Sequence, residues 1–397
     1  MKILFLTNQF PNKENPTQGT FNVSRAESLI KLGHIVKVIS PIGLTPNKKN
    51  VFPIPKIKTI IREIRHKKRI QNSLVEENIE VFYPKWFWLP RRFFWKFETF
   101  FLHLFAGSKI KRIVTEFNPD LIITTWLHPY GTYANYIEKY YSKKIVTIAE
   151  GSDLLEMPFE IKGWSSIENS FNRSSSELIF VSNQQQNFVE RELHLKQGKV
   201  IVNGFNHSSF YYTKKPKKAN NKQLRLITVG SLYPVKGYDL ILKALLILGK
   251  NFHLTIIGDG FMKDEYLTFV KENKLNDQVV FLGTVPNAKI KIYLEEADIY
   301  CQPSRSESFG IAALEAMGCG LPVVVSNVGG MSEMVTDDFN GYVFEKDSID
   351  ELVNKIILAS RKKWDQEAIA VWAKKNYSWD KWAQKILTMH HDSNILN

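Results

Sequence analysis

The feature that most constrains the fold is a regular alternation of short apolar runs with longer helical stretches. The apolar runs are rich in β-branched residues, which is typical of buried strands. They occupy residues 2–7, 35–40, 120–125, 144–149, 178–181 and 199–202, and then residues 225–230, 253–258, 278–283, 298–302 and 322–326. The alternation predicts parallel sheets with helices on both faces.

The helical stretches between these runs form two series. They occupy residues 20–32, 131–141 and 184–192, and then residues 238–248, 263–273, 288–296 and 349–360. A polar, lysine-rich segment without periodicity, residues 214–222, separates the series and is typical of a linker. Because a chain of 397 residues fits two domains of about 200 residues, we expect one sheet in each.

The segment of residues 304–318 carries the clearest sign of chemistry. It places two carboxylates, Glu307 and Glu315, eight positions apart, and a helix is expected to begin near Phe309. Backbone N–H groups at the helix start would form an anion site between the two carboxylates. The alternative is a capped helix start, with Glu315 as a surface charge.

The residues around this segment complete a longer pattern. A glycine turn, a buried strand and polar positions follow at residues 318–322, 323–326, 329–330, 333 and 340–341. The whole run, from Val279 to Phe344, resembles the donor-binding signature of the retaining glycosyltransferases with GT-B architecture, the glycosyl transferases group 1 (family 4). The resemblance implies an α/β fold of two facing, Rossmann-like, doubly wound parallel-sheet domains with an interdomain cleft.

The resemblance also implies where the domains begin and end. Residues 376–379 resemble the family's closing aromatic segment, after which the chain crosses back to the first domain. We therefore expect an acceptor-side domain of residues 1–205 plus about 377–397, a linker of residues 206–222, and a donor-binding domain of residues 223–376.

The resemblance places the donor diphosphate at the loop after the first strand of the second domain. In that loop Gly230 lets a ligand approach the backbone, and Lys236 contacts the diphosphate. The family has an Arg or a small residue near Ser231. Because the Arg is absent here, Lys236 carries the charge alone or together with Arg305.

The other donor contacts are implied in the same way. They are the backbone amides of Phe309, Gly310 and Ile311 for the phosphates, Glu315 for the ribose, Glu307 for the sugar hydroxyls, and the loop of Gly258 and Asp259 for the base.

Three segments of the first domain are expected at the site. Gly19 stands where the family brings the backbone close to the transferred sugar. The family usually has a His before the sequence Gly-Ser-Asp, but Glu150 stands there, followed by Asp153. Either Glu150 holds sugar hydroxyls, or His128, which also follows a strand, supplies the imidazole.

The resemblance implies retaining transfer of a UDP- or GDP-linked sugar to an acceptor hydroxyl. Lys236, Glu307, His128, Glu150 and Asp153 are the candidate catalytic residues. No Asp-x-Asp motif occurs in the sequence, so we expect metal independence and no cofactor besides the donor substrate. The expected acceptor is a lipid-linked saccharide in the synthesis of a bacterial surface polymer such as capsule or lipopolysaccharide.

The net charge of +13 is concentrated in the first half of the chain. Residues 48–69 are densely basic, with Glu63 as their only acid, and residues 82–105 are dense in aromatics, Trp86 to Phe101 above all. Basic and aromatic residues together suit an anionic membrane surface. The alternatives are a solvated loop followed by a helix that packs its aromatics on the sheet, and a nucleic-acid surface, which we do not expect.

Other features limit the setting. Two cysteines form no metal or disulfide framework, no apolar run is long enough to span a membrane, and residues 1–7 resemble a first strand rather than a signal peptide. We expect a cytoplasmic protein at the inner face of the cell membrane. Rival hypotheses are a different GT-B enzyme, such as a nucleotide-sugar epimerase or a phosphorylase, and a non-catalytic basic protein that binds membranes or nucleic acid.

Overall fold

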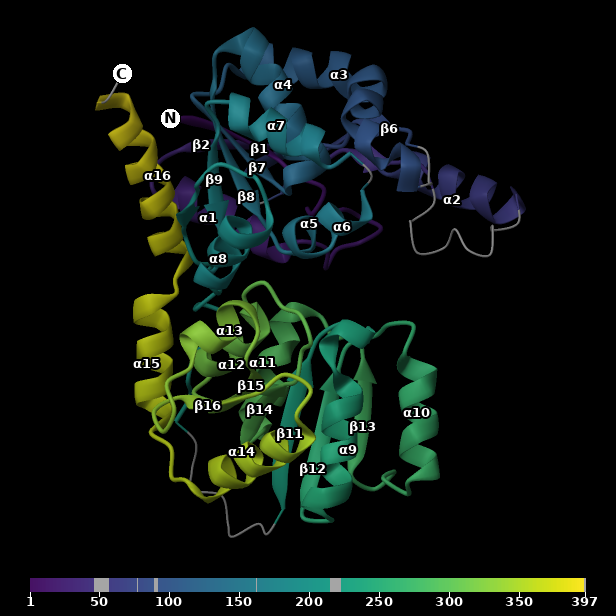
Figure 1. The fold of residues 1–397 in the computed structure, drawn as a ribbon, viewed down its shortest axis with the longest axis vertical. Coiled ribbons are helices and arrows are strands. Elements are labelled where there is room, and N and C mark those ends of the chain that lie inside the picture. Colours follow the sequence, from purple (N-terminus) through teal and green to yellow (C-terminus); the bar gives the residue numbers. More distant parts are fainter. Residues whose placement is uncertain (46–56, 77, 89–91, 162, 215–222, 396–397) are drawn as a thin grey trace. The chain divides into compact units, whose positions relative to one another are not determined.

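The computed structural model describes residues 1–45, 57–76, 78–88, 92–161, 163–214 and 223–395, which form two compact units (Figure 1). The first unit holds Met1–Val181 and Gln185–Ile201, and the second holds Ser182–Gln184 and Val202–Asn397. The second unit thus includes residues 377–397, which the sequence assigns to the first domain. It also includes residues 206–214 of the expected linker, whereas residues 215–222 lie outside the described residues.

The first unit is built on an eight-stranded sheet of order β10-β9-β8-β7-β1-β2-β5-β4. Its strands are β1 (Lys2–Leu6), β2 (Ile35–Ile39), β4 (Ser73–Glu76), β5 (Ile79–Phe82), β7 (Leu121–Thr125), β8 (Lys144–Ala149), β9 (Glu177–Phe180) and β10 (Lys199–Val200). All neighbours are parallel except β4 and β5, and a separate pair joins β3 (Ile42–Gly43) to β6 (Lys85–Trp86). Every residue of β7 is buried, as expected for a parallel strand covered on both faces.

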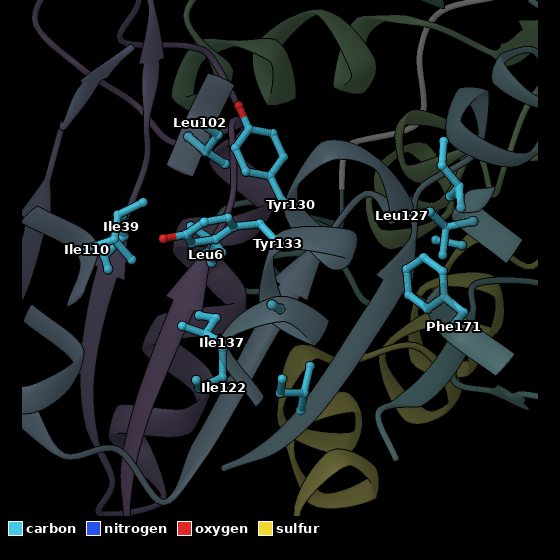
Figure 2. Packing of buried hydrophobic residues seen from close by; sticks show 14 of the residues in the cluster. Leu6, Ile39, Leu102, Ile110, Ile122, Leu127, Tyr130, Tyr133, Ile137 and Phe171 are labelled. Carbon is cyan, nitrogen blue, oxygen red and sulfur yellow. The ribbon is translucent and has the colours of Figure 1, made fainter. Parts of the chain in front are cut away.

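The helices of the first unit follow these strands along the chain. They are α1 (Thr20–Lys31), α2 (Ile57–Arg69), η2 (Arg92–Phe97), α3 (Glu98–Phe117), η3 (Leu127–Gly131), α4 (Thr132–Tyr141), α5 (Ser152–Leu155), α6 (Met157–Glu160), α7 (Ser165–Arg173) and α8 (Asn183–Glu192). Figure 2 shows part of the core that they enclose, where Leu6 and Ile122 of the central strands meet Tyr133 and Ile137 of α4.

The second unit is built on a six-stranded sheet of order β13-β12-β11-β14-β15-β16, parallel throughout. Its strands are β11 (Leu224–Val229), β12 (Phe252–Ile257), β13 (Val279–Gly283), β14 (Ile299–Gln302), β15 (Val323–Ser326) and β16 (Gly341–Phe344). Its helices are η4 (Pro234–Lys236), α9 (Tyr238–Leu248), α10 (Lys263–Glu272), α11 (Asn287–Glu296), α12 (Ile311–Gly318), α13 (Gly329–Met334), α14 (Ile349–Arg361), α15 (Gln366–Asn376) and α16 (Trp379–Ile395).

Each unit is therefore a Rossmann-like, doubly wound sheet, which confirms the fold class predicted from the sequence. Every expected strand and helix overlaps an element of its own kind, whereas the strands β3, β4, β5, β6 and β16 were not expected. The strand order reverses between β1 and β7 in the first unit and between β11 and β14 in the second. Open α/β sheets bind ligands beyond the carboxyl ends of the strands at such reversals. Among the described residues, no helix is long and apolar enough to cross a membrane.

Candidate functional site

The loops that follow β11 and β14 lie side by side at the strand reversal of the second unit. The backbone N–H of Arg305 donates to the carbonyl of Val235 at 2.7 Å. Gly237 has φ of 67°, and a Cβ added there would stand 1.9 Å from the carbonyl oxygen of Pro303. Only glycine fits this close approach of two backbones, which sets the positions of the residues on either side.

The pair of Lys236 and Glu307 lies at the centre of this arrangement. Nζ of Lys236 donates to Oε2 of Glu307 at 2.5 Å, and both side chains are mostly buried. The amide of Gln302 donates to the same oxygen at 2.8 Å, and the backbone N–H of Ser308 lies 3.2 Å from Oε1. The hydroxyl of Tyr300 in turn donates to Gln302 at 2.8 Å, so the carboxylate is held from both sides.

Arg305 is placed differently from the sequence expectation. Its guanidinium binds both carboxylate oxygens of Asp239 at 2.8 Å, and its Nε donates to Asp347 at 2.6 Å. A further donor reaches the carbonyl of Pro234 at 2.9 Å. Two carboxylates thus engage the charge that was expected to serve as a second phosphate cation.

The first backbone N–H groups of α12 have no acceptor within the helix, so they are directed outward from its amino end. Gly310 precedes Ile311 with φ of 92°, and a Cβ there would stand 2.3 Å from Met331. No side chain of the described residues caps this end, and its first turn holds no acid. The Phe309 side chain is buried beside Tyr377, so only its backbone is available to a ligand.

Glu315 lies one turn inside α12. Burial of its carboxyl raises the pKa to about 8, although contact with the side chain of Asn287 opposes the shift. The residue is half-buried, so its surface is not fully covered by protein. A large part of this carboxyl is therefore protonated at neutral pH.

The remaining expected donor residues lie at the same edge. Gly230 directly follows β11, and Gly258 directly follows β12. A Cβ added to Gly258 would stand 1.9 Å from the carbonyl oxygen of Gly230. Ser231 is exposed in the loop beyond. Asp259 is an exposed turn residue whose carboxylate accepts from the backbone of Gly260 at 2.8 Å and from Lys263 at 3.2 Å.

A second polar cluster lies at the strand reversal of the first unit. Thr7 directly follows β1, and Thr125 ends β7. Their hydroxyl oxygens are 2.7 Å apart. Asn22 of α1 donates to the carbonyl of Gln9 at 2.8 Å. Gly19 precedes α1 with φ of 64°, and a Cβ there would stand 2.2 Å from the same carbonyl oxygen. Gly19 is thus required by the close packing of its own loop.

Glu150 follows β8 at this edge and pairs with Arg25 of α1. A guanidinium nitrogen of Arg25 lies 2.5 Å from Oε1 of Glu150, and the other lies 3.5 Å from Oε2. The Arg25 side chain is fully buried, whereas that of Glu150 is 10% exposed. Asn22 accepts from the same guanidinium at 2.9 Å.

Asp153, a candidate catalytic residue, is a buried carboxylate with three backbone partners. It is completely buried and accepts backbone N–H groups of Glu150, Gly151 and Leu127 at 3.0, 2.7 and 2.9 Å. Burial raises its pKa to about 6, and these backbone hydrogen bonds oppose the shift. Asp153 therefore joins the loops after β7 and β8.

His128, the other candidate for the family's histidine, lies inside the first unit. Its side chain is buried, with Nδ1 3.1 Å from the hydroxyl of Thr132 and Nε2 2.7 Å from the carbonyl oxygen of Trp95. Both ring nitrogens are engaged by the protein, so the imidazole is a core group.

Several residues that hold the site together were not expected from the sequence. These are Arg25, Asp239, Tyr300, Gln302 and Asp347. Gln302 and Tyr300 carried a usable signal, because polar side chains at the carboxyl end of a central strand face a ligand site. Among the described residues, no three His, Cys, Asp or Glu side chains gather as metal ligands would.

Comparison with known proteins identifies the second unit. Residues 212–379 match the family model described as Glycosyl transferases group 1. An uncharacterized glycosyltransferase of Methanocaldococcus jannaschii is 29% identical over 284 residues, which cover 70% of this chain and 77% of that protein. The putative teichuronic acid biosynthesis glycosyltransferase TuaC of Bacillus subtilis is 25% identical over 343 residues, which cover 84% of this chain and 83% of that protein.

A solved structure extends the likeness to both units. Anabaena Alr3699/HepE in complex with UDP superposes with a TM-score of 0.69 at 20% identity, covering 99% of this chain and 100% of that one. The second unit therefore resembles the glycosyl transferases group 1 family, and the chain has the GT-B fold.

Proposed function

We propose that this chain transfers a sugar from a UDP- or GDP-linked donor to an acceptor hydroxyl, with retention of configuration and without a metal ion. The observation that carries the proposal is the meeting of Lys236, Glu307 and the uncapped amino end of α12 at one strand reversal. The related Anabaena structure contains UDP, which favours uridine as the base.

The leaving diphosphate needs positive charge as its bond to the sugar breaks. Lys236 and the first N–H groups of α12 supply that charge from fixed positions, and such pre-arranged groups stabilise a transition state without reorganisation. In the proposed reaction the acceptor oxygen bonds to the anomeric carbon on the face that the diphosphate leaves. The acceptor proton then passes to the leaving phosphate oxygen.

The two carboxylates of the signature take separate tasks in this proposal. Glu307, held by Gln302 and the backbone of Ser308, accepts sugar hydroxyls and stays in place when Lys236 turns to the phosphate. Glu315 accepts the ribose hydroxyls, and its ionised form is the better acceptor.

The first unit contributes Glu150 in our proposal. Its Oε2 has one long contact, 3.5 Å to Arg25, and remains able to accept hydroxyl donors from a saccharide. The backbone at Gly19 and the side chain of Asn22 border the same sheet edge. The carboxylate of Asp153 fixes the loop at this edge, because it accepts backbone N–H groups of that loop.

We further propose a lipid-linked acceptor at the inner face of the cell membrane. The relative named for teichuronic acid biosynthesis supports a surface polymer as product. Exposed apolar side chains follow one face of η2 and α3, namely Phe97, Phe100 and Leu104, with Phe87 and Phe105 beside them. We call this set the aromatic face.

The basic segment of the sequence is only partly described. Residues 48–56 lie outside the described residues, but Arg62, Arg65, Lys68 and Arg69 of α2 are exposed. Trp86, Trp88 and Trp95 are buried in the core, so these aromatic residues of the stretch do not face a membrane surface. The membrane proposal therefore rests on the exposed phenylalanine and leucine side chains of the aromatic face.

Ligand-induced thermal stabilisation tests the proposal. The protein is heated with UDP-, GDP-, ADP- and dTDP-sugars beside the Glu315→Ala variant, because a ligand stabilises the fold by RT ln(1 + [L]/Kd). A rise in Tm with one base, lost in the variant, supports the donor site and names the nucleotide. The absence of any rise in the wild-type protein would overturn the proposal.

A further inference from the structure

We infer that Arg305 is a positioning residue of the donor site, which acts through Lys236 rather than by binding the diphosphate. The inference rests on the proposed function. The arginine that the family has near Ser231 is absent from this chain. In this inference Lys236 alone binds the diphosphate in its place, and Arg305 holds Lys236 in position.

Arg305 holds the loop that carries Lys236 at two successive residues. Its side chain donates to the carbonyl of Pro234 at 2.9 Å, and its backbone N–H donates to the carbonyl of Val235 at 2.7 Å. Lys236 is the next residue, at the end of the short η4 turn. Arg305 also lies two positions before Glu307, so one residue links both partners of the central ion pair.

The guanidinium has little capacity left for a ligand. An arginine side chain carries five N–H donors, and four of the Arg305 donors are used by Asp239, Asp347 and Pro234. A diphosphate needs a free fork of two parallel donors, and that fork is occupied by Asp239. Binding phosphate would therefore require breaking the bidentate pair.

The charges around Arg305 support the same conclusion. Its hydrogen bonds to Asp239 raise the Arg305 pKa further, with Asp347 adding to the effect. Burial alone would raise the pKa of Asp239, but Arg305 and Lys243 lower it below its usual value. Two carboxylates against one guanidinium give this group no excess positive charge to offer a phosphate.

The hydrogen bonds of Arg305 limit the motion of Lys236. Without the Arg305 side chain, the carbonyl of Pro234 loses its donor from the β14 loop. The η4 turn then keeps its local bonds, from Lys236 N to Tyr233 at 2.9 Å and from Gly237 N to Pro234 at 3.1 Å, and the backbone bonds of residues 305 and 306 to Val235. A lysine side chain is flexible, and a displacement of about 1 Å at a catalytic group can cost about 100-fold in rate. We therefore expect loss of Arg305 to weaken phosphate binding through misplacement of Lys236.

A double-mutant cycle tests this inference. The Kd for UDP is measured by titration calorimetry for the wild-type protein, Arg305→Gln, Lys236→Ala and the double variant, with uridine as the ligand without phosphate. GDP and guanosine replace them if the wild type binds GDP instead. We expect Arg305→Gln to weaken diphosphate binding five- to twentyfold, the order of one lost charge-assisted contact. We expect it to have no further effect in the Lys236→Ala background and to leave nucleoside binding unchanged.

The matched control is Arg225→Gln. Arg225 lies near the amino end of β11, pairs with both oxygens of Asp298 at 3.1 and 2.8 Å, and is as exposed as Arg305. Its loss should lower Tm without changing the Kd for UDP. Arg305→Lys keeps a charge but not the fork and should restore only part of the affinity.

The outcomes are distinct. If the fold-changes in Kd of the two single variants multiply in the double variant, Arg305 is a direct ligand and the inference is overturned. A Kd unchanged by Arg305→Gln would also overturn it. If the wild-type protein binds neither UDP nor GDP, the proposed function itself fails, and the inference with it.

Discussion

Lys236 and Glu307 form an ion pair between the loops that follow two adjacent parallel strands, with Nζ of Lys236 2.5 Å from Oε2 of Glu307. Glu307 has two other donors, Gln302 and the backbone of Ser308. A diphosphate at the amino end of α12 can therefore attract Lys236 while the carboxylate keeps its place. In the proposed reaction, Lys236 serves the phosphate and Glu307 serves the sugar.

Lys236→Ala should lower kcat/KM for the donor by about 10²–10³-fold, the usual effect of removing one group that stabilises transition-state charge. The measurement is the rate of nucleotide release from the donor that stabilises the protein most. Lys355→Ala is the control, because Lys355 pairs with Asp337 on the surface at 3.3 Å. Equal rates for the wild type and Lys236→Ala would refute a role in charge stabilisation.

The pKa of Glu315 predicts a pH-dependent affinity for the nucleotide. The raised value, about 8, means that the carboxyl is mostly protonated at pH 7 and mostly ionised at pH 9. If the ribose binds the ionised form, apparent affinity follows the ionised fraction and should rise about tenfold from pH 7 to pH 9.

Calorimetric titration of UDP at several pH values checks this prediction. Affinity should reach a plateau above the folded-state pKa, with proton release on binding below it. Glu315→Gln cannot ionise and should show a flat profile over the same range. A wild-type profile as flat as that of the variant would contradict the role of Glu315 ionisation.

Much of the fold followed from the sequence because parallel strands buried on both faces are continuous apolar runs. The strands β4 and β5 escaped notice because they carry acids that interrupt the apolar pattern. The strand β16 escaped notice because its first residue, Gly341, was grouped with the polar positions of the signature. The position of Glu307 and Lys236 after central strands was also predictable, because loops at a strand reversal converge.

Side-chain direction was not predictable in the same way. His128 follows a strand just as Glu150 does, but its ring turns inward to Thr132 and Trp95. Arg25 meets Glu150 across 125 positions of sequence, and Arg305 meets Asp239 across 66. Such pairings depend on how separate elements pack, which no local pattern records.

Arg25 and Glu150 should behave as a buried ion pair in stability measurements. Arg25→Met leaves a carboxylate nearly buried without its partner, and we expect a loss of about 3–5 kcal/mol in the free energy of unfolding. The double variant Arg25→Met, Glu150→Met should recover most of that loss, because apolar groups of similar volume replace buried pairs well.

Urea unfolding followed by circular dichroism measures these effects. Lys37→Met is the control on the same sheet, because its pair with Glu80 is more exposed than that of Arg25 with Glu150 and should contribute less than about 1 kcal/mol. The stable double variant should still lose transferase activity, since Glu150 is proposed to hold hydroxyls. Full activity in that variant would assign Glu150 to structure alone.

The aromatic face predicts binding to anionic membranes. Phe100 and Leu104 are 59% and 60% exposed on one face of α3, and Lys111 lies two turns further along that face. Phe100→Ser with Leu104→Ser should weaken sedimentation with vesicles of phosphatidylcholine and phosphatidylglycerol by about tenfold or more, because each buried apolar side chain contributes about 1.5–3 kcal/mol.

The matched control is Leu246→Ser with Ile247→Ser, which replaces two exposed apolar residues of α9 in the second unit. It should leave vesicle binding unchanged. Salt should weaken wild-type binding, and neutral vesicles should bind less, because exposed basic residues of α2 add charge attraction of about 1 kcal/mol each. Equal binding by the wild type and the α3 variant would mean that this face does not meet the membrane.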